Sequence, residues 1–557
     1  MARGPDVRGT IESDESVDAG RSHRAIAVSR VTHILTRRTQ LNSDHDLQRG
    51  PSKGADAALI REFIIEGLYG YRTISLASPY AATILIARNG TGKTTLLGAL
   101  DAFLRMQLGR LRGLDFALIR CRLDGVEEEL VLTHDDVVNF LQVPEDATFN
   151  RVAARASLEP KVLFNFIVEE YLSTNRTERL NTESKVFASL ASSMNYSYND
   201  VEKTLEQITD SIFARSAAIS SIRTALRSRI GDMQIVYLPT YRRVELALTD
   251  DEDENTYRRR RGPKIALAAG SLFTGDIQFG LGDISERLGQ INGEIVYSSN
   301  NGYREISANI INDLIDGRFE RHNVASGETP SRADLKIFFS RLREGRRSGH
   351  YPSVQAPDLE KLYDSSSVPE SSKPFLDYFL NQLGVVIKST KALEEPIDLF
   401  VNSCNKYLLS EEPSTDIGTH VSGDSSKRVI GKKLCINRQN LRVHVESSSK
   451  GRKISLNSLS SGEKQMISLF AKLFLYPREK IVLIDEPELS LSIDWQSQIL
   501  VDVLNAPLCR QVIAITHSPF VFDNELDPFA RSIKVDDEED FEWFDVDELE
   551  FGDEDEG

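Results

Sequence analysis

The stretch Ala87-Arg88-Asn89-Gly90-Thr91-Gly92-Lys93-Thr94-Thr95 decides the fold, because its spacing fits the A-x-x-x-x-G-K-T form of a phosphate-binding loop. The apolar residues 82–86 before it predict a buried strand, and apolar residues at helical spacing after it predict a helix. A strand, loop and helix in this order place backbone N–H groups and the positive end of a helix dipole around phosphate oxygens. The sequence therefore predicts an α/β fold with a nucleotide phosphate site.

The polar residues of this loop have separate expected roles. Gly90 and Gly92 let the backbone curl around phosphate oxygens. Lys93 is expected on the β- and γ-phosphates of ATP, and Thr94 is expected to ligate Mg²⁺. The expected ATP-binding residues in this loop are Asn89, Gly90, Thr91, Gly92, Lys93, Thr94 and Thr95.

Ala87 departs from the usual motif, which has glycine at this position. If Ala87 had to adopt a positive φ, its Cβ would cost on the order of 1 kcal/mol. We expect a weakened tolerance at this position, but not the loss of nucleotide binding.

A carboxylate pair follows a second apolar run far along the chain. Residues 481–484 predict a buried strand that ends at Asp485 and Glu486. Asp485 is suited to hold Mg²⁺, directly or through water, and Glu486 is placed to orient or deprotonate the attacking water. Acidic pairs are common on protein surfaces, so this prediction depends on the strand end and on the phosphate-binding loop upstream.

Ser460, Gly462 and Glu463 form a capping box before a helix whose apolar face is Met466, Ile467, Phe470, Leu473 and Phe474. One interpretation is a well-capped helix and nothing more. The functional interpretation is that Ser460 and Gly462 bind ATP, because the Ser460 hydroxyl and the helix dipole would point at a γ-phosphate.

His517 follows the apolar strand 511–515 and begins a loop. A lone histidine usually has a structural role. Its position directly after the last core strand favours a catalytic role as a sensor of the γ-phosphate.

Composition excludes several classes of protein. No run of about 18 apolar residues exists, so we expect no membrane contact. The N-terminal residues lack the apolar segment of a secretory signal, and the four cysteines show no C-x-x-C zinc or redox pattern. We therefore expect a cytoplasmic protein with reduced thiols.

The net charge of −17 comes mostly from the C-terminal end of the chain. Residues 536–556 carry 14 acidic and no basic side chains, so the rest of the chain is close to neutral. An acidic tail is most often a solubilising extension, and partner docking or mimicry of nucleic acid is the alternative. Two basic clusters, Arg258–Arg261 and a group that contains Arg341, Arg343, Arg346 and Arg347, are ambiguous. The first is either a self-paired loop or a contact with DNA or RNA.

The patterns divide the chain into five segments. We expect a disordered extension over 1–57, an N-terminal lobe of the ATPase head over 58–135 and a mostly helical insertion over 136–430. The C-terminal lobe follows over 431–530, and the acidic tail over 531–557. Within the insertion, residues 233–239 read as a strand.

The loop at 87–95, the signature Leu459–Gln465, the Asp485–Leu491 segment and Thr516–Pro519 together resemble an ABC-type ATPase head. The most similar branch contains the RecF, SMC and overcoming-lysogenization-defect (OLD) proteins. This resemblance implies the fold class: an α/β, ABC-type P-loop ATPase head with a large, mostly helical insertion.

A narrower resemblance connects the chain with the PtuA ATPases of Septu and retron antiphage defence systems. It rests on residues 67–71, 237–243, 490–496 and 517–524. The resemblance implies ATP and Mg²⁺ as ligands, head-to-tail dimers or higher assemblies, and an HNH nuclease partner. A complex with a reverse transcriptase and its noncoding RNA is a further expectation. OLD-type nucleases carry a C-terminal Toprim domain, for which the residues after His517 leave no room, so we expect no intrinsic nuclease.

Two alternatives belong to other classes. A DNA-repair or chromosome-maintenance ATPase of the RecF or SMC type would need basic channels and DNA-stimulated turnover, and an SMC protein would also need long heptads. A transporter motor has its signature much closer to the phosphate-binding loop than Ser460 is to Lys93, so this class is disfavoured.

Overall fold

The computed structural model describes residues 53–88, 90–172, 184–194, 198–239, 281–317, 329–344, 357–363, 368–411, 429–448 and 451–537. Four expectations lie wholly or mostly outside these residues. They concern Asn89, the extension over 1–57, the Arg258–Arg261 cluster and the tail beyond Asp537. None of the helices in the described part of the chain combines the length and apolar character that a bilayer span requires.

A parallel sheet forms the centre of the head, with the strand order β13-β3-β12-β11-β6. Its strands are β3 (Ala82–Ile86), β6 (Gln234–Leu238), β11 (Lys480–Asp485), β12 (Cys509–Thr516) and β13 (Ala530–Ser532). All residues of β11 and nearly all of β12 are buried, as expected for parallel strands covered on both faces. The predicted strands at 82–86, 233–239, 481–484 and 511–515 are confirmed.

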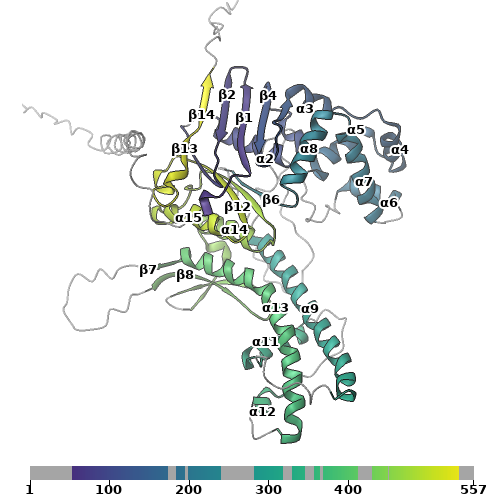
Figure 1. Ribbon diagram of the computed structural model, residues 1–557, viewed down its shortest axis with the longest axis vertical. Helices are drawn as coiled ribbons and strands as arrows, with labels where there is room; N and C mark the ends of the chain where they lie inside the picture. Colours follow the sequence, from purple (N-terminus) through teal and green to yellow (C-terminus); the bar gives the residue numbers. More distant parts are fainter. Residues whose placement is uncertain are drawn as a thin grey trace, which may run out of the picture. The chain divides into compact units, whose positions relative to one another are not determined.

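A second, antiparallel sheet has the order β14-β2-β1-β4-β5 (Figure 1). It consists of β1 (Ile60–Leu68), β2 (Arg72–Ala77), β4 (Leu118–Leu123), β5 (Leu130–Thr133) and β14 (Lys534–Asp537). Helix α2 (Lys93–Leu104) packs against it, and Phe63 of β1 meets Phe103 of α2 edge to face at 5.8 Å between ring centroids. The phosphate-binding loop is thereby held between two sheets.

Shorter helices add to the core of this lobe. They are α3 (His134–Phe140), α4 (Ala147–Arg155), α5 (Pro160–Asn165), α6 (Lys185–Ser193), α7 (Tyr198–Phe213) and α8 (Ala217–Arg229). Short 3₁₀ turns lie at Lys53–Ala55, Leu108–Leu111, Glu370–Ser372, Leu456–Ser458, Pro519–Val521 and Asp527–Phe529, and a π-helical turn lies at Phe166–Tyr171. Buried side chains of these helices join those of β1, β4 and α2 in one apolar core.

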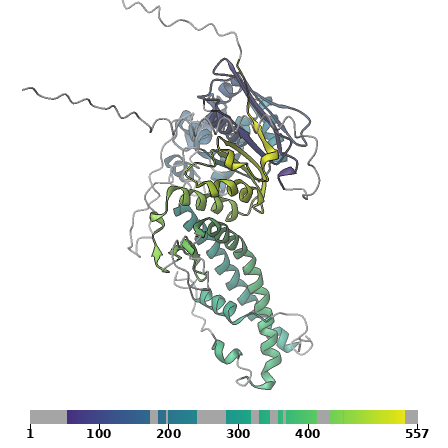
Figure 2. The same ribbon diagram turned by 90° about the vertical axis from the view of Figure 1, so that its left-hand side faces the viewer.

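Two long helices, α9 (Leu281–Ile315) and α13 (Lys373–Leu408), run beside each other (Figure 2). They pack with α11 (Arg332–Glu344) and α12 (Leu359–Tyr363) around a separate apolar cluster that includes Leu335, Phe338, Leu342 and Leu383. The near ends of α9 and α13 pack on α14 (Ser461–Phe474). The long helices therefore share a core with the strands of the head.

A third sheet, with the order β10-β9-β8-β7, lies next to α13 in the contacts of the chain. Its strands are β7 (Leu409–Glu411), β8 (Val429–Ile436), β9 (Val443–Ser447) and β10 (Lys453–Ile454). Helix α15 (Ile493–Asn505) joins β11 to β12 and buries Ile499, Leu500 and Val503.

The middle of the chain is not the single helical insertion that we expected over 136–430. Residues up to Arg229 pack into the N-terminal lobe, and β6 pairs in parallel with β11 in the central sheet. Only the later segment forms the long-helix unit. At the C-terminal end, β13 and β14 pair with β3 and β2, so ordered sheet continues to Asp537 and not only to residue 530. The sequence missed both features because strand pairing depends on distant residues.

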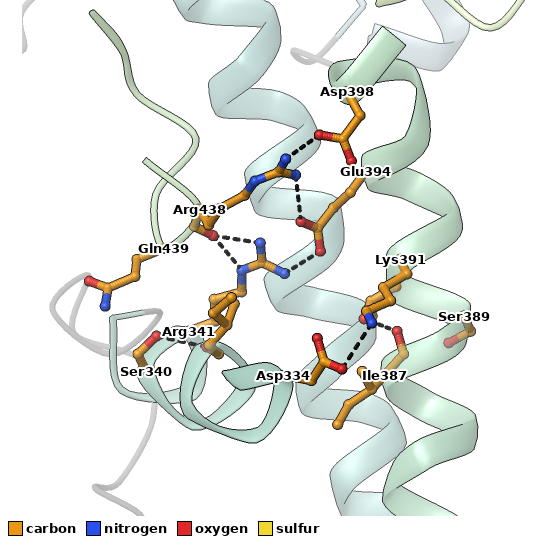
Figure 3. A network of polar contacts seen from close by, with 12 residues as sticks. Asp334, Ser340, Arg341, Ile387, Ser389, Lys391, Glu394, Asp398, Arg438 and Gln439 are labelled. Atoms are coloured by element: carbon orange, nitrogen blue, oxygen red, sulfur yellow. Dashed lines mark hydrogen bonds and ion pairs between the residues drawn. The ribbon is translucent and has the colours of Figure 1, made fainter. Parts of the chain in front are cut away.

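Arg341 is a buried structural residue and not an exposed basic contact (Figure 3). Its guanidinium donates to the Glu394 carboxylate at 2.7 Å and to the backbone carbonyl of Arg438 at 3.0 and 2.5 Å. Arg438 in turn contacts Glu394 at 3.6 Å and Asp398. The network joins α11, α13 and the turn between β8 and β9. Arg341 therefore does not contribute a surface charge to the basic cluster that the sequence indicated.

Candidate phosphate-binding site

The parallel sheet explains why distant residues meet. Strands β3, β11 and β12 run in the same direction, so their carboxyl ends lie at one edge of the sheet. The phosphate-binding loop follows β3, the Asp485-Glu486 pair closes β11, and His517 follows β12. This edge therefore collects one basic, two acidic and one imidazole side chain from three segments.

Lys93 is the centre of this group and is largely buried. Its ammonium donates to the Glu486 carboxylate at 2.9 Å and also contacts Nε2 of His517. The His517 ring lies 3.7 Å from the same Glu486 oxygen. Because the Lys93–Glu486 pair is mostly shielded from water, its charges interact more strongly than an exposed pair would.

The surroundings of His517 favour its uncharged form. Burial, followed by the positive charge of Lys93, lowers the pKa of His517 below its ordinary value of 6.5. The imidazole is therefore neutral at pH 7 in this arrangement.

Thr94 and Asp485 form the second contact of the site. The Thr94 hydroxyl donates to an Asp485 carboxylate oxygen at 2.5 Å, and Asp485 is fully buried. A hydroxyl and a carboxylate are hard oxygen ligands of the kind that Mg²⁺ prefers. These two residues therefore fit the metal that the sequence predicted.

Backbone geometry in the loop agrees with phosphate binding. Gly90 and Gly92 both have a φ of +81°, which residues with a Cβ rarely adopt. Gly92 also packs closely, since an added Cβ would lie 2.6 Å from Ile74. Ala87 is buried with a φ outside the positive range, so the expected penalty for alanine at this position does not arise.

Glu488, which no sequence pattern singled out, fixes the loop that carries His517. Its carboxylate accepts from the backbone N–H of His517 at 2.9 Å and of Ser518 at 3.3 Å. It also accepts from the Thr516 hydroxyl at 2.8 Å. Its position two residues after Glu486 was the available signal, but only the folded loop shows the contacts.

Arg72 is a second residue that the sequence did not indicate. It donates to the carbonyl of Gly90 at 3.0 Å and to both carboxylate oxygens of Asp537, at 2.6 and 3.0 Å. The antiparallel register between β2 and β14 places Asp537 opposite Arg72. The phosphate-binding loop is thus connected to the last described strand of the chain.

The signature segment, Leu459–Gln465, has the predicted capping box and begins helix α14, outside the group of residues around Lys93. The Ser460 side chain caps α14 by accepting from the Glu463 backbone N–H, and the Glu463 carboxylate accepts from the Ser460 backbone N–H at 2.7 Å. Lys432 of β8 donates to the same Glu463 carboxylate at 2.8 Å. An added Cβ at Gly462 would lie 2.2 Å from the carbonyl oxygen of Ser490, which explains why glycine is needed there.

The structure brings together Lys93, Thr94, Asp485, Glu486 and His517. Thr91 closes the loop by donating to the Arg88 carbonyl at 2.9 Å, and Thr95 lies in the first turn of α2. Among the hydrogen bonds and ion pairs found between described residues, none joins Ser460 or Gly462 to this group. Ser460 is exposed at the start of α14.

Comparison with known proteins gives a match to one family model. The model described as "AAA domain, putative AbiEii toxin, Type IV TA system" matches residues 268–523, just under half of the chain. The match includes Ser460, the Asp485-Glu486 pair and His517, and it begins after Lys93. A search among curated proteins gave no match.

Two solved structures are similar to the chain at low identity. One is the Smc head domain of Pyrococcus furiosus with an extended coiled coil, bound to the C-terminal domain of ScpA. It shows 11% identity over 86% of this chain and 96% of that chain, with a TM-score of 0.29. The other is an Smc head bound to the C-winged helix domain of ScpA, with 10% identity over 86% and 98% and a TM-score of 0.30.

The family match and the geometry support one statement about the molecule. Residues 268–523 are similar to the AAA domain of that family, and the predicted α/β fold with a large helical part is confirmed.

Proposed function

We propose that this protein is the ATP-hydrolysing subunit of a bacterial antiphage defence system of the Septu or retron type. The observation that carries this proposal is the convergence of Lys93, Glu486 and His517, next to the Thr94–Asp485 pair. The match to a putative toxin domain supports a defence role. The resemblance to PtuA ATPases gives the narrower assignment.

The contacts of Lys93 indicate how ATP would enter the site. Lys93 now has the Glu486 carboxylate as its anionic partner, and the phosphates of ATP would replace that carboxylate. Glu486 would then be released to orient or deprotonate the attacking water. Thr94 and Asp485 would hold Mg²⁺, which would neutralise developing charge on the phosphates. His517, held neutral beside Lys93, would contact the γ-phosphate.

The separation of the signature segment supports a site completed by two subunits. Ser460 is exposed at the N-terminus of a 14-residue helix and has a full capping box. Its hydroxyl and the helix dipole favour an anion. We propose that two copies pack head to tail, so that Ser460 and Gly462 of one subunit contact the ATP held by Lys93 of the other.

The finer parts of the proposal concern partners and location. The ATPase would act in the cytoplasm and control a separate HNH nuclease, with no nuclease activity of its own. A reverse transcriptase with its noncoding RNA would be a further partner in a retron-type system. Contact with DNA or RNA through Arg258–Arg261 belongs to the same proposal.

Two substitutions test the nucleotide site. Lys93→Ala should abolish ATP binding, measured by calorimetry or by a fluorescent analogue. Glu486→Gln should lose turnover while it binds ATP more tightly. The reason is that a neutral amide replaces the Glu486 carboxylate, which competes with the ATP phosphates for Lys93. It should also trap an ATP-bound dimer, visible by light scattering.

Glu479→Gln is the matched control, since Glu479 is an exposed residue just before β11, at the end of the strand opposite to Glu486. Among the ion pairs between described residues, Glu479 pairs with the exposed Arg510. It should leave turnover and ATP binding unchanged. Unchanged turnover in Glu486→Gln would refute the catalytic assignment. Turnover that rises severalfold with duplex DNA would instead favour a DNA-repair or chromosome-maintenance ATPase.

A further inference from the structure

We propose that Cys435, His444 and Glu446 form a zinc site on the strand pair β8–β9. The site lies outside the phosphate-binding region and does not depend on the proposed ATPase function. Neither the spacing of the cysteines nor the family match indicates it.

The register of the two strands brings the three residues onto one face. Cys435 lies directly opposite His444 in the antiparallel pairing of β8 and β9. Glu446 is two residues after His444, and side chains two apart in a strand point to the same side. The neighbouring pair Leu434 and Val445 points to the other side and is fully buried. The three polar side chains therefore face away from the core.

The ligand atoms are already close together. Nε2 of His444 and Oε1 of Glu446 are 2.9 Å apart. The Cys435 sulfur, a ring nitrogen of His444 and a carboxylate oxygen of Glu446 all lie within 4.8 Å of one another. Zinc binds such ligands at about 2.0–2.3 Å, so the ligands of a tetrahedral ion lie roughly 3–4 Å apart. Small side-chain rotations would bring all three onto one ion. The three residues are half-buried, so an ion can reach them from solvent.

The chemistry of the donors selects the metal. A thiolate, an imidazole and a carboxylate are the ligand types of Zn²⁺, whereas Mg²⁺ and Ca²⁺ prefer oxygen ligands alone. Three protein ligands leave a fourth position for water or for a residue of a partner. The cysteine must lose its proton when the metal binds, so each ion bound releases about one proton.

The competing explanation is an ordinary cross-strand ion pair. Lys433 of β8 and Lys453 of β10 both lie opposite Glu446 in the strand register, and their charges oppose a cation. If Glu446 serves only these lysines and His444, no metal will bind. The two explanations therefore differ in a measurable result.

The zinc site would stabilise strands β8 and β9, whose other face contacts helix α14. Lys432 precedes Lys433 on β8, alternates to the other face and binds Glu463 of α14 at 2.8 Å. A metal across β8 and β9 would fix the strand from which Lys432 extends.

Cobalt titration of the reduced full-length protein tests the proposal, because a thiolate–Co²⁺ bond gives a charge-transfer band in the near ultraviolet. The other three cysteines are buried, so Cys435 is the accessible thiol of the chain. The nucleotide site offers oxygen and imidazole ligands but no thiol, so it cannot give this band. We expect the band to appear, to disappear when Zn²⁺ is added, and to resist excess Mg²⁺.

Variants assign the ligands. Cys435→Ser should abolish the band, and His444→Gln and Glu446→Gln should each weaken zinc affinity by at least about 10–100-fold, the range seen for outer-shell partners of metals. Lys433→Ala is the matched control on the same face and should keep or strengthen binding. Circular dichroism would confirm that each variant is folded. Absence of the band in the folded, reduced protein, or its survival in Cys435→Ser, would overturn the proposal.

Discussion

Replacing Arg341 by methionine is expected to loosen helix α11 from α13. The Arg341 side chain is 3% exposed and its partner Glu394 is 12% exposed, so the substitution leaves a nearly buried carboxylate without its closest cation. Removing one partner of a buried ion pair costs about 3–5 kcal/mol. Glu394 keeps a weaker contact with Arg438 at 3.6 Å, so we expect the lower end, about 3 kcal/mol.

A double substitution separates the charge effect from the packing effect. Arg341→Met together with Glu394→Leu removes both buried charges and keeps apolar volume in their place. Such replacements are often neutral for stability, so the double variant should recover to within about 1 kcal/mol of the parent. The second substitution should therefore restore about 2 kcal/mol of the roughly 3 kcal/mol that Arg341→Met loses.

Hydrogen–deuterium exchange of the α11 amides is the suitable assay, because it reports local opening of one part of a large protein. The difference of about 2 kcal/mol between the single and double variants corresponds to a roughly 30-fold difference in protection. The amides of β12 serve as an internal reference. Arg332→Met on the same helix is the matched control, since its pair with Glu360 is exposed and should contribute less than about 1 kcal/mol.

The reasoning fails on either of two results. The first is protection of α11 in Arg341→Met that stays within about threefold of the parent, below the 1 kcal/mol scale of an exposed pair. The second is a double variant that is as unprotected as the single one, which would show that packing and not charge dominates.

Three further outcomes are expected. Gly462→Ala should lower stability by about 1–3 kcal/mol and slow ATP turnover, because the added Cβ would lie 2.2 Å from the Ser490 carbonyl oxygen. Thermal unfolding measures the stability and a phosphate-release assay measures the turnover, and a variant as stable as the parent would contradict the prediction. Asp537→Asn should tighten ATP binding severalfold, because it frees Arg72 beside the phosphate-binding loop, and equal affinity in calorimetry would count against this contact. Burial lowers the pKa of Lys480 to about 8 from 10.5, so between these values the unfolded chain binds more protons at this residue and the contribution of Lys480 to stability should rise with pH. The stability of the parent relative to Lys480→Met should therefore rise across that window, measured by denaturant unfolding of both proteins at several pH values.

Much of the nucleotide site could be predicted from local sequence. The phosphate-binding loop, the capping box at Ser460 and the carboxylates after β11 each depend on residues within a few positions of one another. Their chemistry follows from residue type and from the strand or helix that they end or begin. Only the structure shows that alanine at position 87 carries no conformational penalty, because the φ of Ala87 depends on how the loop packs.

The places of other residues could not be predicted because their partners are distant in the chain. Arg341 looked like part of a basic surface cluster, but α13 and the β8–β9 turn bury it. The Cys435, His444 and Glu446 group needs the exact register of two strands, since a shift by one residue would move the ligands to opposite faces.

The sequence by itself determined the α/β unit and its phosphate-binding-loop motif, because backbone turns, helix caps and strand ends are set by neighbouring residues. The tertiary structure decided that β6 belongs to the central sheet and that Glu488 holds the His517 loop. It also decided that, among the hydrogen bonds of the described residues, none joins Ser460 to Lys93. These contacts are long-range, and their existence depends on which strands pair and which faces become buried.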